Sequence, residues 1–513
     1  MRRASFRVVL YTLALATVLF MAACGGGEVP HIAVTTSVSA TPNPLVANYS
    51  VTSLIAGTVL VEFGTDTSYP LQTASYPIQA NKTLSVLVAG MRPSTTYHMR
   101  AEVLVEGSAA WTDEDQVFTT GPVTTALPPL TVTRSSPSNA QYSENGGVEQ
   151  VAFSSSYQTL NAFVTDRDGN LIWYYNPAPR TPGFYRLMPN GHILVCLNAE
   201  TSNNLTSLIR EIDLAGNTIR EIDSTAMQSK LHTAGHGDNF LVFHHDFLPL
   251  PSGHVIVLGQ TTRNFTNLVG YPGTSTVYGD MLVDLDQDWN PVWVWSAFDH
   301  LDVNRHLQAF PDWTHSNAIV YNPNDGNLML SIRHQSWVIG IDYQNGSGSG
   351  NVLWRLGDQG DFNLAGGDPS QWFYAQHFPD LVSINGSQIT LAVFDNGNLR
   401  VLDSQGDTCG GLGPDCYTRA TLYKFDQSTM QAQLLWQYAP GFFSFWGGAI
   451  VGLPNGNVEF GMSQPFPIPR LGSQIMEMTP SNPAEVVWQM DLRGGYSYRA
   501  YRIPSLYPGV SWP

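Results

Sequence analysis

Two short turn motifs alternate along most of this 513-residue chain, and their recurrence restricts the fold more than any other feature. The first, Asp166-x-x-Gly169-x-x-x-Trp173, returns in variants that end at Arg220, Trp293, Trp354, Trp436 and Trp488. The second contains Gly after Asn, Ser or Asp and each time opens an apolar run; it covers residues 189–191, 251–253, 324–326, 385–386 and 454–456. Such residues supply the positive φ angles of tight hairpin turns. We therefore predict a series of antiparallel hairpins.

The spacing of the motifs predicts how the hairpins are arranged. One unit spans ~60–70 residues, which allows several short strands in each repeat. Repeats of this length with a tryptophan on the outer strand are typical of four-stranded blades around an axis. Six tryptophan-or-equivalent positions predict a six-bladed β-propeller over residues 136–513. A parallel β-helix needs shorter repeats, and a helical solenoid needs a period of about 3.6 residues, which is absent.

A smaller all-β unit precedes the repeats. Apolar residues alternate at 58–63 and 84–88, and the stretch 90–100 is similar to the turn and tyrosine strand of a fibronectin type III domain. We predict a fibronectin III/Ig-like β-sandwich, with a short tether, over residues 24–125. Residues 126–135, rich in Pro and Thr, are the expected linker.

The first residues resemble a secretion signal. Residues 1–23 combine a basic start with an apolar run, and Cys24 follows the small residues Ala22 and Ala23. This pattern predicts a lipoprotein-type signal peptide with Cys24 as the lipidation site, and a plain signal peptide or membrane anchor is the alternative. We expect an exported lipoprotein, periplasmic or on the cell surface, that contacts the membrane through its lipid alone.

Charge and cysteine content restrict the partners. The formal net charge is -17, and only 24 residues are Lys or Arg, so nucleic acid is excluded as an expected partner. Cys409 and Cys416 flank a glycine-rich loop, and we predict a local disulfide between them. Cys196 lies in an apolar run and is expected to be a buried strand residue.

Three segments carry the candidate site residues. His244 and His245 stand just before a repeat strand, where Asp246 can fix a histidine tautomer; a surface turn is the alternative. His315 and Asn317 flank Ser316, so on a strand both face the same side. Arg333, next to His334, offers the planar fork that matches an oxyanion, although a strand-end ion pair would explain it as well.

His377 lies in the third segment, among Phe, Tyr and Gln side chains, directly before an apolar strand. A partly dry, aromatic environment keeps an imidazole neutral, and the neutral form is the nucleophile. A packed residue at a strand edge is the equally simple alternative.

The blocks 244–254, 315–335, 376–380 and 393–397, with the tail Tyr498-Arg-Ala-Tyr-Arg502, resemble the bacterial arylsulfate sulfotransferase family. His315-x-Asn317 followed by Arg333-His334-Gln335 is the most specific part. The resemblance implies that His377 is a nucleophile that becomes transiently sulfated. It implies further that His245, His315 and Arg333 are catalytic and that Asn317, His244 and His334 bind substrate. The choice between His244 and His245 as the catalytic residue stays open.

The implied reaction moves a sulfuryl group from a phenolic sulfate donor to a phenol acceptor by a ping-pong cycle, without a nucleotide donor, cofactor or metal. The cysteine pair follows His377 here, whereas it precedes the nucleophile in the family pattern, which leaves the acceptor preference open. The resemblance also implies a homodimer. The alternatives are a quinoprotein-like propeller oxidoreductase and a non-catalytic, surface-tethered binding propeller.

Overall fold

The computed structural model of the chain describes residues 34–138, 142–155, 158–198, 206–403, 405–411, 414–464 and 472–513. The expected signal peptide and Cys24 lie outside the described residues. Strands dominate, and the helices are short: α1 (Ser224–Thr233), α2 (Ala297–His300), and the single 3-10 turns η1 (Arg333–Gln335), η2 (Gln344–Gly346) and η3 (Pro369–Gln371). Across these ranges, no helix has the length and apolar character needed to span a membrane. The all-β prediction is confirmed.

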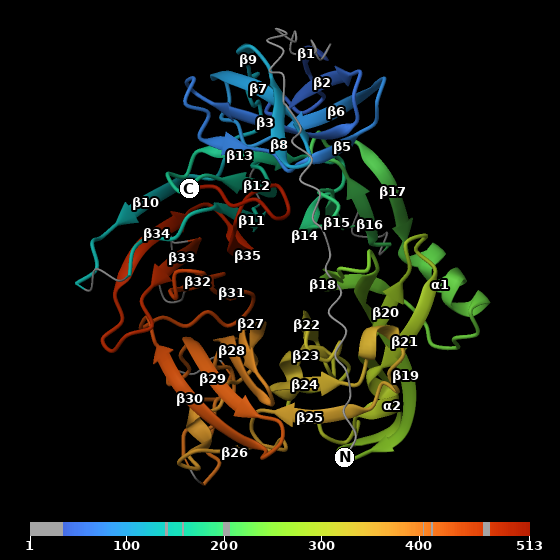
Figure 1. Cartoon of the computed structure of the whole chain (residues 1–513). Coiled ribbons are helices and arrows are strands. Elements are labelled where there is room, and N and C mark those ends of the chain that lie inside the picture. The colour runs from blue at the N-terminus through green and yellow to red at the C-terminus, as the bar shows by residue number, and fades with distance from the viewer. Residues whose placement is uncertain are drawn as a thin grey trace, which may run out of the picture.

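The N-terminal strands form two antiparallel sheets around a shared core (Figure 1). One sheet holds β1 (Val34–Ala40), β2 (Ala47–Ser53) and β6 (Lys82–Val88). The other holds β3 (Gly57–Gly64), β4 (Leu71–Gln72), β5 (Tyr76–Ile78), β7 (Thr96–Val105), β8 (Ser108–Thr112) and β9 (Gln116–Thr119). Alternate residues such as Tyr49 on β2 and Met99 on β7 are buried between the sheets. This period of two is what the alternating sequence predicts.

Six further sheets follow, each four- or five-stranded within the described residues. Three of them contain β35 (Tyr496–Ile503), β11 (Val148–Ser154), β12 (Ala162–Thr165) and β13 (Leu171–Tyr175); β14 (Pro182–Leu187), β15 (Ile193–Leu197), β16 (Leu208–Ile212) and β17 (Thr218–Asp223); and β18 (Val242–Pro249), β19 (Val255–Leu268), β20 (Tyr271–Leu285) and β21 (Pro291–Ser296).

The other three contain β22 (Ser316–Tyr321), β23 (Leu328–Ile332), β24 (Trp337–Ile341) and β25 (Val352–Leu356); β27 (His377–Asn385), β28 (Gln388–Asp395), β29 (Arg419–Asp426), β30 (Gln431–Tyr438) and β26 (Asn363–Leu364); and β31 (Ala449–Gly452), β32 (Val458–Met462), β33 (Ser473–Met478), β34 (Val486–Leu492) and β10 (Leu130–Arg134).

These sheets are arranged in a ring (Figure 1). One edge strand of each sheet contacts the corresponding strand of the next sheet, in the closed order β35, β14, β18, β22, β27, β31 and back to β35. Strand β35, close to the C-terminal end, pairs with β11, so the last strand of the ring completes the first sheet. An all-β ring of radially arranged antiparallel sheets is β-propeller-like.

The residues that end the first turn motif connect neighbouring sheets. The indole Nε1 of Trp173 on β13 donates to the carbonyl of Leu214 in the next sheet over 2.8 Å. Trp488 on β34 donates over 2.9 Å to the carbonyl of Arg167, which belongs to the first sheet. In the second sheet Arg220 takes the tryptophan's place and donates to a carbonyl of the third sheet. The same link to the next sheet is made by Trp293, Trp354 and Trp436.

Two segments lie elsewhere than the sequence alone implies. The stretch 126–135, predicted as the linker, contains β10, which pairs with β34 at the outer edge of the last sheet. The residues after β35 leave the ring and pack on the N-terminal sheets, where the Tyr507 hydroxyl accepts from the Ala89 N–H over 2.7 Å. The indole of Trp512 donates in the same region to the carbonyl of Gln72.

The cysteine predictions are confirmed. Cys409 and Cys416 form a disulfide. Cys196 lies on β15 and is buried.

Candidate active site

Four edge strands of the ring bring distant histidines together. The ring centroids of His245 and His315 are 4.7 Å apart, although the first belongs to β18 and the second directly precedes β22. Tyr498 on β35 lies near two of these histidines. Its ring centroid is 5.7 Å from that of His245 and 6.4 Å from that of His377 on β27. The sequence-predicted histidines therefore share one place on the inner side of the ring.

Irregular pairing at the starts of these strands aims the side chains. The register of β18 shifts between Phe243 and Phe247, so that the residues between them do not continue the ladder. His245 and His315 take positive φ angles of 59° and 51°. The register of β27 shifts directly after His377. Bulges of this kind re-aim side chains and are concentrated near active sites.

A buried amide determines the tautomer of His377. Its Nδ1 lies 2.7 Å from Oδ1 of Asn396, and the Asn396 Nδ2 donates to the carbonyls of Ser444 and Gly447 over 2.7 and 3.1 Å. Because those bonds assign the amide orientation, Asn396 Oδ1 accepts and Nδ1 of His377 carries the proton. Its Nε2 therefore holds a lone pair, which accepts from the Gly447 N–H at 3.2 Å.

His377 is also kept neutral. His377 is only 3 % exposed, and this burial holds the pKa of its imidazole well below the ordinary value. The nearby charge of Arg333 lowers this pKa further. A neutral imidazole with an unprotonated Nε2 can act as a nucleophile, which agrees with the sequence-based hypothesis.

Arg333 is a half-buried guanidinium bonded to neutral groups. Its Nη1 donates to Nε2 of His334 over 2.7 Å and its Nη2 to the carbonyl of Phe445 over 3.0 Å, while its Nε has no partner in the described part of the chain. Burial lowers the pKa of Arg333. A cation that is partly removed from water and has no hydrogen-bonded carboxylate partner is costly. The arrangement therefore favours an anionic ligand beside this side chain.

Asn317 contributes by position. Its Nδ2 donates to the carbonyl of Gln376 over 2.7 Å, which ties β22 to the residue before His377. Its Oδ1 is buried and, among the described groups, has no hydrogen-bond partner.

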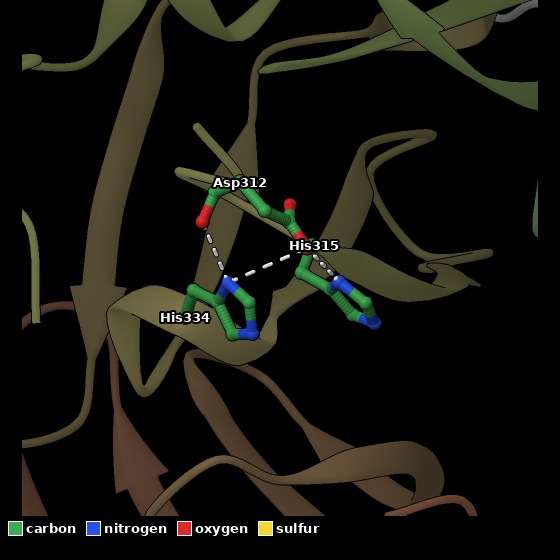
Figure 2. Close-up of side chains that lie close together, drawn as sticks. All are labelled: Asp312, His315 and His334. Atoms are coloured by element: carbon green, nitrogen blue, oxygen red, sulfur yellow. Dashed lines mark hydrogen bonds and ion pairs between the residues drawn. The ribbon is translucent and has the colours of Figure 1, made fainter. Parts of the chain in front are cut away.

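Asp312 connects the two histidines of the fourth sheet (Figure 2). His315 Nδ1 lies 2.5 Å from Asp312 Oδ2, and His334 Nδ1 lies 2.8 Å from the Asp312 carbonyl. Burial, and next the charge of His315, lowers the pKa of His334 to about 4. Burial alone would raise the pKa of Asp312, but the hydrogen bond from His315 and the charges of His315 and His334 together lower it.

The same three residues are the group that could hold a metal ion in the described ranges. The ring geometry does not fit this role. The imidazoles of His315 and His334 are stacked, with centroids 4.5 Å apart and planes 26° from parallel. A metal ion binds in the plane of an imidazole, so two stacked rings do not direct their lone pairs to one point. Both nitrogens of His334 are moreover engaged, by Arg333 and by the Asp312 carbonyl.

The structure separates the roles of His244 and His245. His245 is enclosed, and burial holds its pKa well below the ordinary value, with His315 the next cause. His244 lies beside it, with 2.7 Å between the two Nδ1 atoms. The Nε2 of His244 faces Oδ1 of Asp280 at 3.2 Å. His245 thus faces the other site histidines, and His244 stands behind it.

Asp246 does not orient either histidine, contrary to the sequence-based hypothesis. Its carboxylate takes two bonds from Arg186, over 2.9 and 2.8 Å, and one from Arg499 over 2.9 Å. Arg499 also donates to the backbone carbonyls of His245 and Asn317, so this network holds β35, β18 and β22 together. An acidic residue adjacent in sequence was misleading because arginines from two other strands, β14 and β35, already engage its carboxylate.

An aromatic cavity of about 320 Å³ opens beside His244 and His245. Its lining includes Phe153, Phe184, Phe243, Trp446, Tyr496 and Tyr498. The Tyr498 hydroxyl is buried without a hydrogen-bond partner in the described residues, and burial raises the pKa of Tyr498 to about 12. The hydroxyl therefore keeps its proton and is a ready donor. A cavity of this size and composition suits an aryl group.

Sequence reasoning did not assign roles to Asp280, Asp312, Asn396 and Gly447. Asn396 stood within a block that was noted for its family resemblance, and Asp312 lies close to His315 in the chain, but neither position has a local signature. Their functions depend on partners from other strands.

Fold and site together define a β-propeller-like protein with a buried neutral histidine, His377, and an arginine bonded to neutral groups, Arg333, at its inner face. The chain belongs to the arylsulfotransferase (ASST) family, whose model matches residues 135–502. It is therefore a sulfotransferase with a phenolic donor and acceptor in general terms, as the sequence resemblance implied.

Other comparisons add little. No curated protein matches the chain. Similar solved structures include an ACO/RPE65 chimera, with 10% identity, 92% of this chain and 95% of that chain covered, and a TM-score of 0.35. Dihydro-heme d1 dehydrogenase NirN has 12% identity, coverage of 72% and 80%, and a TM-score of 0.32. An auxiliary nutrient binding protein from Bacteroides ovatus has 10% identity, coverage of 75% and 93%, and a TM-score of 0.27. Likeness this weak carries no argument about function.

Proposed function

We propose that this protein is an arylsulfate sulfotransferase that needs no nucleotide donor and transfers the sulfuryl group through a sulfated His377. The observation that carries the proposal is the hydrogen bond from His377 Nδ1 to Asn396 Oδ1, at 2.7 Å, which leaves Nε2 as a neutral, buried nucleophile. Arg333, half-buried and bonded to neutral partners, supports an anionic substrate at the same place.

In the first half-reaction, His377 Nε2 attacks the sulfur of the aryl sulfate. An N–S bond forms while the bond between sulfur and the phenolic oxygen breaks. Transfer of this kind spreads charge over the sulfuryl oxygens, so positioning and electrostatic stabilisation provide most of the catalysis. Arg333 and His315 are the donors expected at those oxygens. The departing phenolate takes a proton from His245.

The sulfated intermediate gains positive charge on its imidazole, and Asn396 stabilises it by accepting from Nδ1–H. In the second half-reaction a phenol enters, returns its proton to His245 and takes the sulfuryl group from Nε2. A neutral amide leaves the imidazole a good leaving group for this step, whereas a carboxylate would draw off the Nδ1 proton. The aromatic cavity supports an aryl donor and acceptor.

The deciding experiment uses 4-nitrophenyl sulfate without an acceptor. One 4-nitrophenol per chain should be released in a burst, and the peptide that holds His377 should gain the mass of one SO3 group. The adduct should be acid-labile and disappear when phenol is added. His377→Asn should abolish both the burst and the adduct.

Steady-state kinetics provide an independent check, because a ping-pong cycle predicts parallel double-reciprocal lines. Intersecting lines without an adduct would instead mean direct transfer between the two phenols. A quinoprotein or a binding propeller would release no phenol from the donor.

The remaining architecture is proposed from the same evidence. The closed ring of six described sheets supports a six-bladed propeller, and the two N-terminal sheets support a fibronectin III/Ig-like sandwich. We also propose that Cys24 is acylated and tethers the protein to a membrane in the periplasm or at the cell surface, because Cys24 follows a signal-like segment.

A further inference from the structure

His244 stands between a carboxylate and the candidate acid–base residue. Its Nδ1 lies 2.7 Å from Nδ1 of His245, and its Nε2 lies 3.2 Å from Oδ1 of Asp280. The His244 side chain is 13 % exposed and that of Asp280 is 3 % exposed, so water does not separate the three groups readily. Their order is Asp280, His244, His245.

Asp280 is an ionised carboxylate that can stabilise a positive charge on the neighbouring His244. Its Oδ2 accepts from the backbone N–H of Ser316 over 2.5 Å. Burial alone would raise the pKa of Asp280, but the contact with His244, its charge and the bonds from Thr314 and Ser316 together lower the pKa to about 2. The carboxylate is therefore ionised.

His245, by contrast, faces other cations or potential cations on every side. His244 adjoins it on β18, His315 approaches from the start of β22, His377 from β27, and Arg499 from β35. Each of these lowers the pKa of His245, and burial lowers it most. The nearby Asp246 is already paired with Arg186 and Arg499. His245 therefore stays neutral and does not store an extra proton. When it gives its one proton to the leaving group, another residue must replace that proton.

We propose that His244 and Asp280 form a proton relay that supplies a proton through His245 to the departing phenolate and takes it back from the incoming phenol. The inference rests on the proposed sulfotransfer and extends it by assigning His244 and Asp280 as positioning and proton-storing residues. His245 touches the substrate oxygen, and the other two act through it.

The proton balance of the relay closes over one cycle. In the resting enzyme, His244 carries protons on both nitrogens beside the Asp280 carboxylate, and His245 carries one on Nε2. When the S–O bond breaks, the phenolate oxygen takes the Nε2 proton of His245. His245 Nδ1 then takes the Nδ1 proton of His244, which becomes neutral. The acceptor phenol reverses both transfers as its oxygen attacks sulfur.

A series of aryl sulfates with leaving groups of different basicity tests the relay. A phenolate of low basicity, such as 4-nitrophenolate, leaves without a proton, whereas unsubstituted phenolate needs one. His244→Gln keeps a hydrogen bond to His245 Nδ1 but cannot pass on a proton. We expect kcat/KM for phenyl sulfate to fall about 100-fold in this variant, and that for 4-nitrophenyl sulfate to fall less than about tenfold.

Asp280→Asn is the second variant. The amide oxygen of the new side chain can still accept from the Ser316 N–H, while the negative charge is lost. It should show the same selective loss. The matched controls are His254→Gln and Asp284→Asn. His254 Nδ1 lies 3.0 Å from Asp284 Oδ1, and Asp284 is on β20 like Asp280, but His254 lines a different cavity from His244. The controls should keep the wild-type dependence on the leaving group.

The outcomes are separable. Equal losses on both donors, or no loss on phenyl sulfate, in folded His244→Gln and Asp280→Asn would overturn the relay. Formation of the His377 adduct from 4-nitrophenyl sulfate in both variants would support it. A wild-type protein that forms no such adduct would contradict the proposed function itself, and the relay with it.

Discussion

The Nδ1 atom of His377 is bonded at 2.7 Å to Oδ1 of Asn396, an amide and not a carboxylate. The amide fixes the tautomer without adding negative charge, so the imidazole stays weakly basic inside the ring. This relationship explains how one residue can both accept and release a sulfuryl group. It also supplies the first prediction.

Asn396→Asp should place a carboxylate beside His377 and raise the pKa of the imidazole, by roughly 1–3 units for an opposite charge at this distance. The raised pKa protonates Nε2 at low pH and removes the nucleophile. We expect kcat/KM to fall as pH drops from about 8 to about 6, whereas the wild-type profile stays flat in this range, since burial lowers its His377 pKa. A pH–rate profile of both proteins checks this, and parallel profiles would contradict the role of Asn396.

Arg333→Lys keeps the positive charge but loses the planar fork, so it should reduce kcat/KM about 100-fold or more, or ~3 kcal/mol, the effect of removing one oxyanion donor. Arg355→Lys is the control, because Arg355 forms a partly exposed pair with Asp361 at 3.3 Å. It should leave turnover unchanged. Near-normal turnover in Arg333→Lys would place this arginine outside the sulfuryl site.

Tyr498→Phe should separate activity from stability. The hydroxyl has no hydrogen-bond partner in the described protein, so its removal should change the free energy of unfolding by less than about 1 kcal/mol. If the hydroxyl donates to substrate, kcat/KM should fall roughly tenfold.

Tyr185→Phe is the matched contrast. The Tyr185 hydroxyl donates to the carbonyl of Phe163 over 2.6 Å, away from the cavity lining, so this variant should lose about 1–2 kcal/mol of stability and keep its turnover. Urea unfolding and steady-state kinetics on both variants measure the two effects. The opposite pattern would refute the assignment of Tyr498.

Acid should destabilise the protein through His334. Its folded pKa is about 4, below the unfolded value of about 6.5, so between these values the unfolded state binds more protons. The stability contributed by the neutral imidazole is complete above about pH 6.5 and is lost as pH falls towards 4. His334→Gln should reduce the difference in unfolding free energy between pH 7 and pH 4.5 by about 1–3 kcal/mol. Urea unfolding at both pH values measures it; an unchanged difference would exclude His334 as the cause.

Cys24→Ala tests the anchor. If Cys24 is acylated, this variant should leave the membrane fraction and keep full sulfotransfer activity, because Cys24 is far in sequence from every site residue. Fractionation followed by an activity assay gives the answer. A variant that remains membrane-bound would disprove lipidation at this position.

The local elements were determined by the sequence itself. The glycine turns and the alternating apolar residues predict hairpins because turn chemistry and strand periodicity act within a few residues. The motif that ends at Trp173 and Trp488 even marks the fourth strand of each sheet counted from the inner edge, and its indoles form the links between neighbouring sheets. His315, Arg333 and His377 were also proposed as site residues from their segments, and these remain predictions.

Only the tertiary structure decided which group each of these side chains meets. Asp246 is next to His245 in the chain but binds Arg186 and Arg499, whereas the distant Asp280 faces His244. Asn396 reaches His377 because β27 and β28 pair and because the 444–447 segment holds its amide. Such partners lie on other strands of the same sheet, as Asp280 on β20 does for His244 on β18, or in the neighbouring sheet, as the 444–447 segment does. Strand pairing and the closure of the ring set them, because both bring together residues that are far apart in the sequence. The sequence therefore determines which side chains are present, and the packing of the ring determines their chemistry.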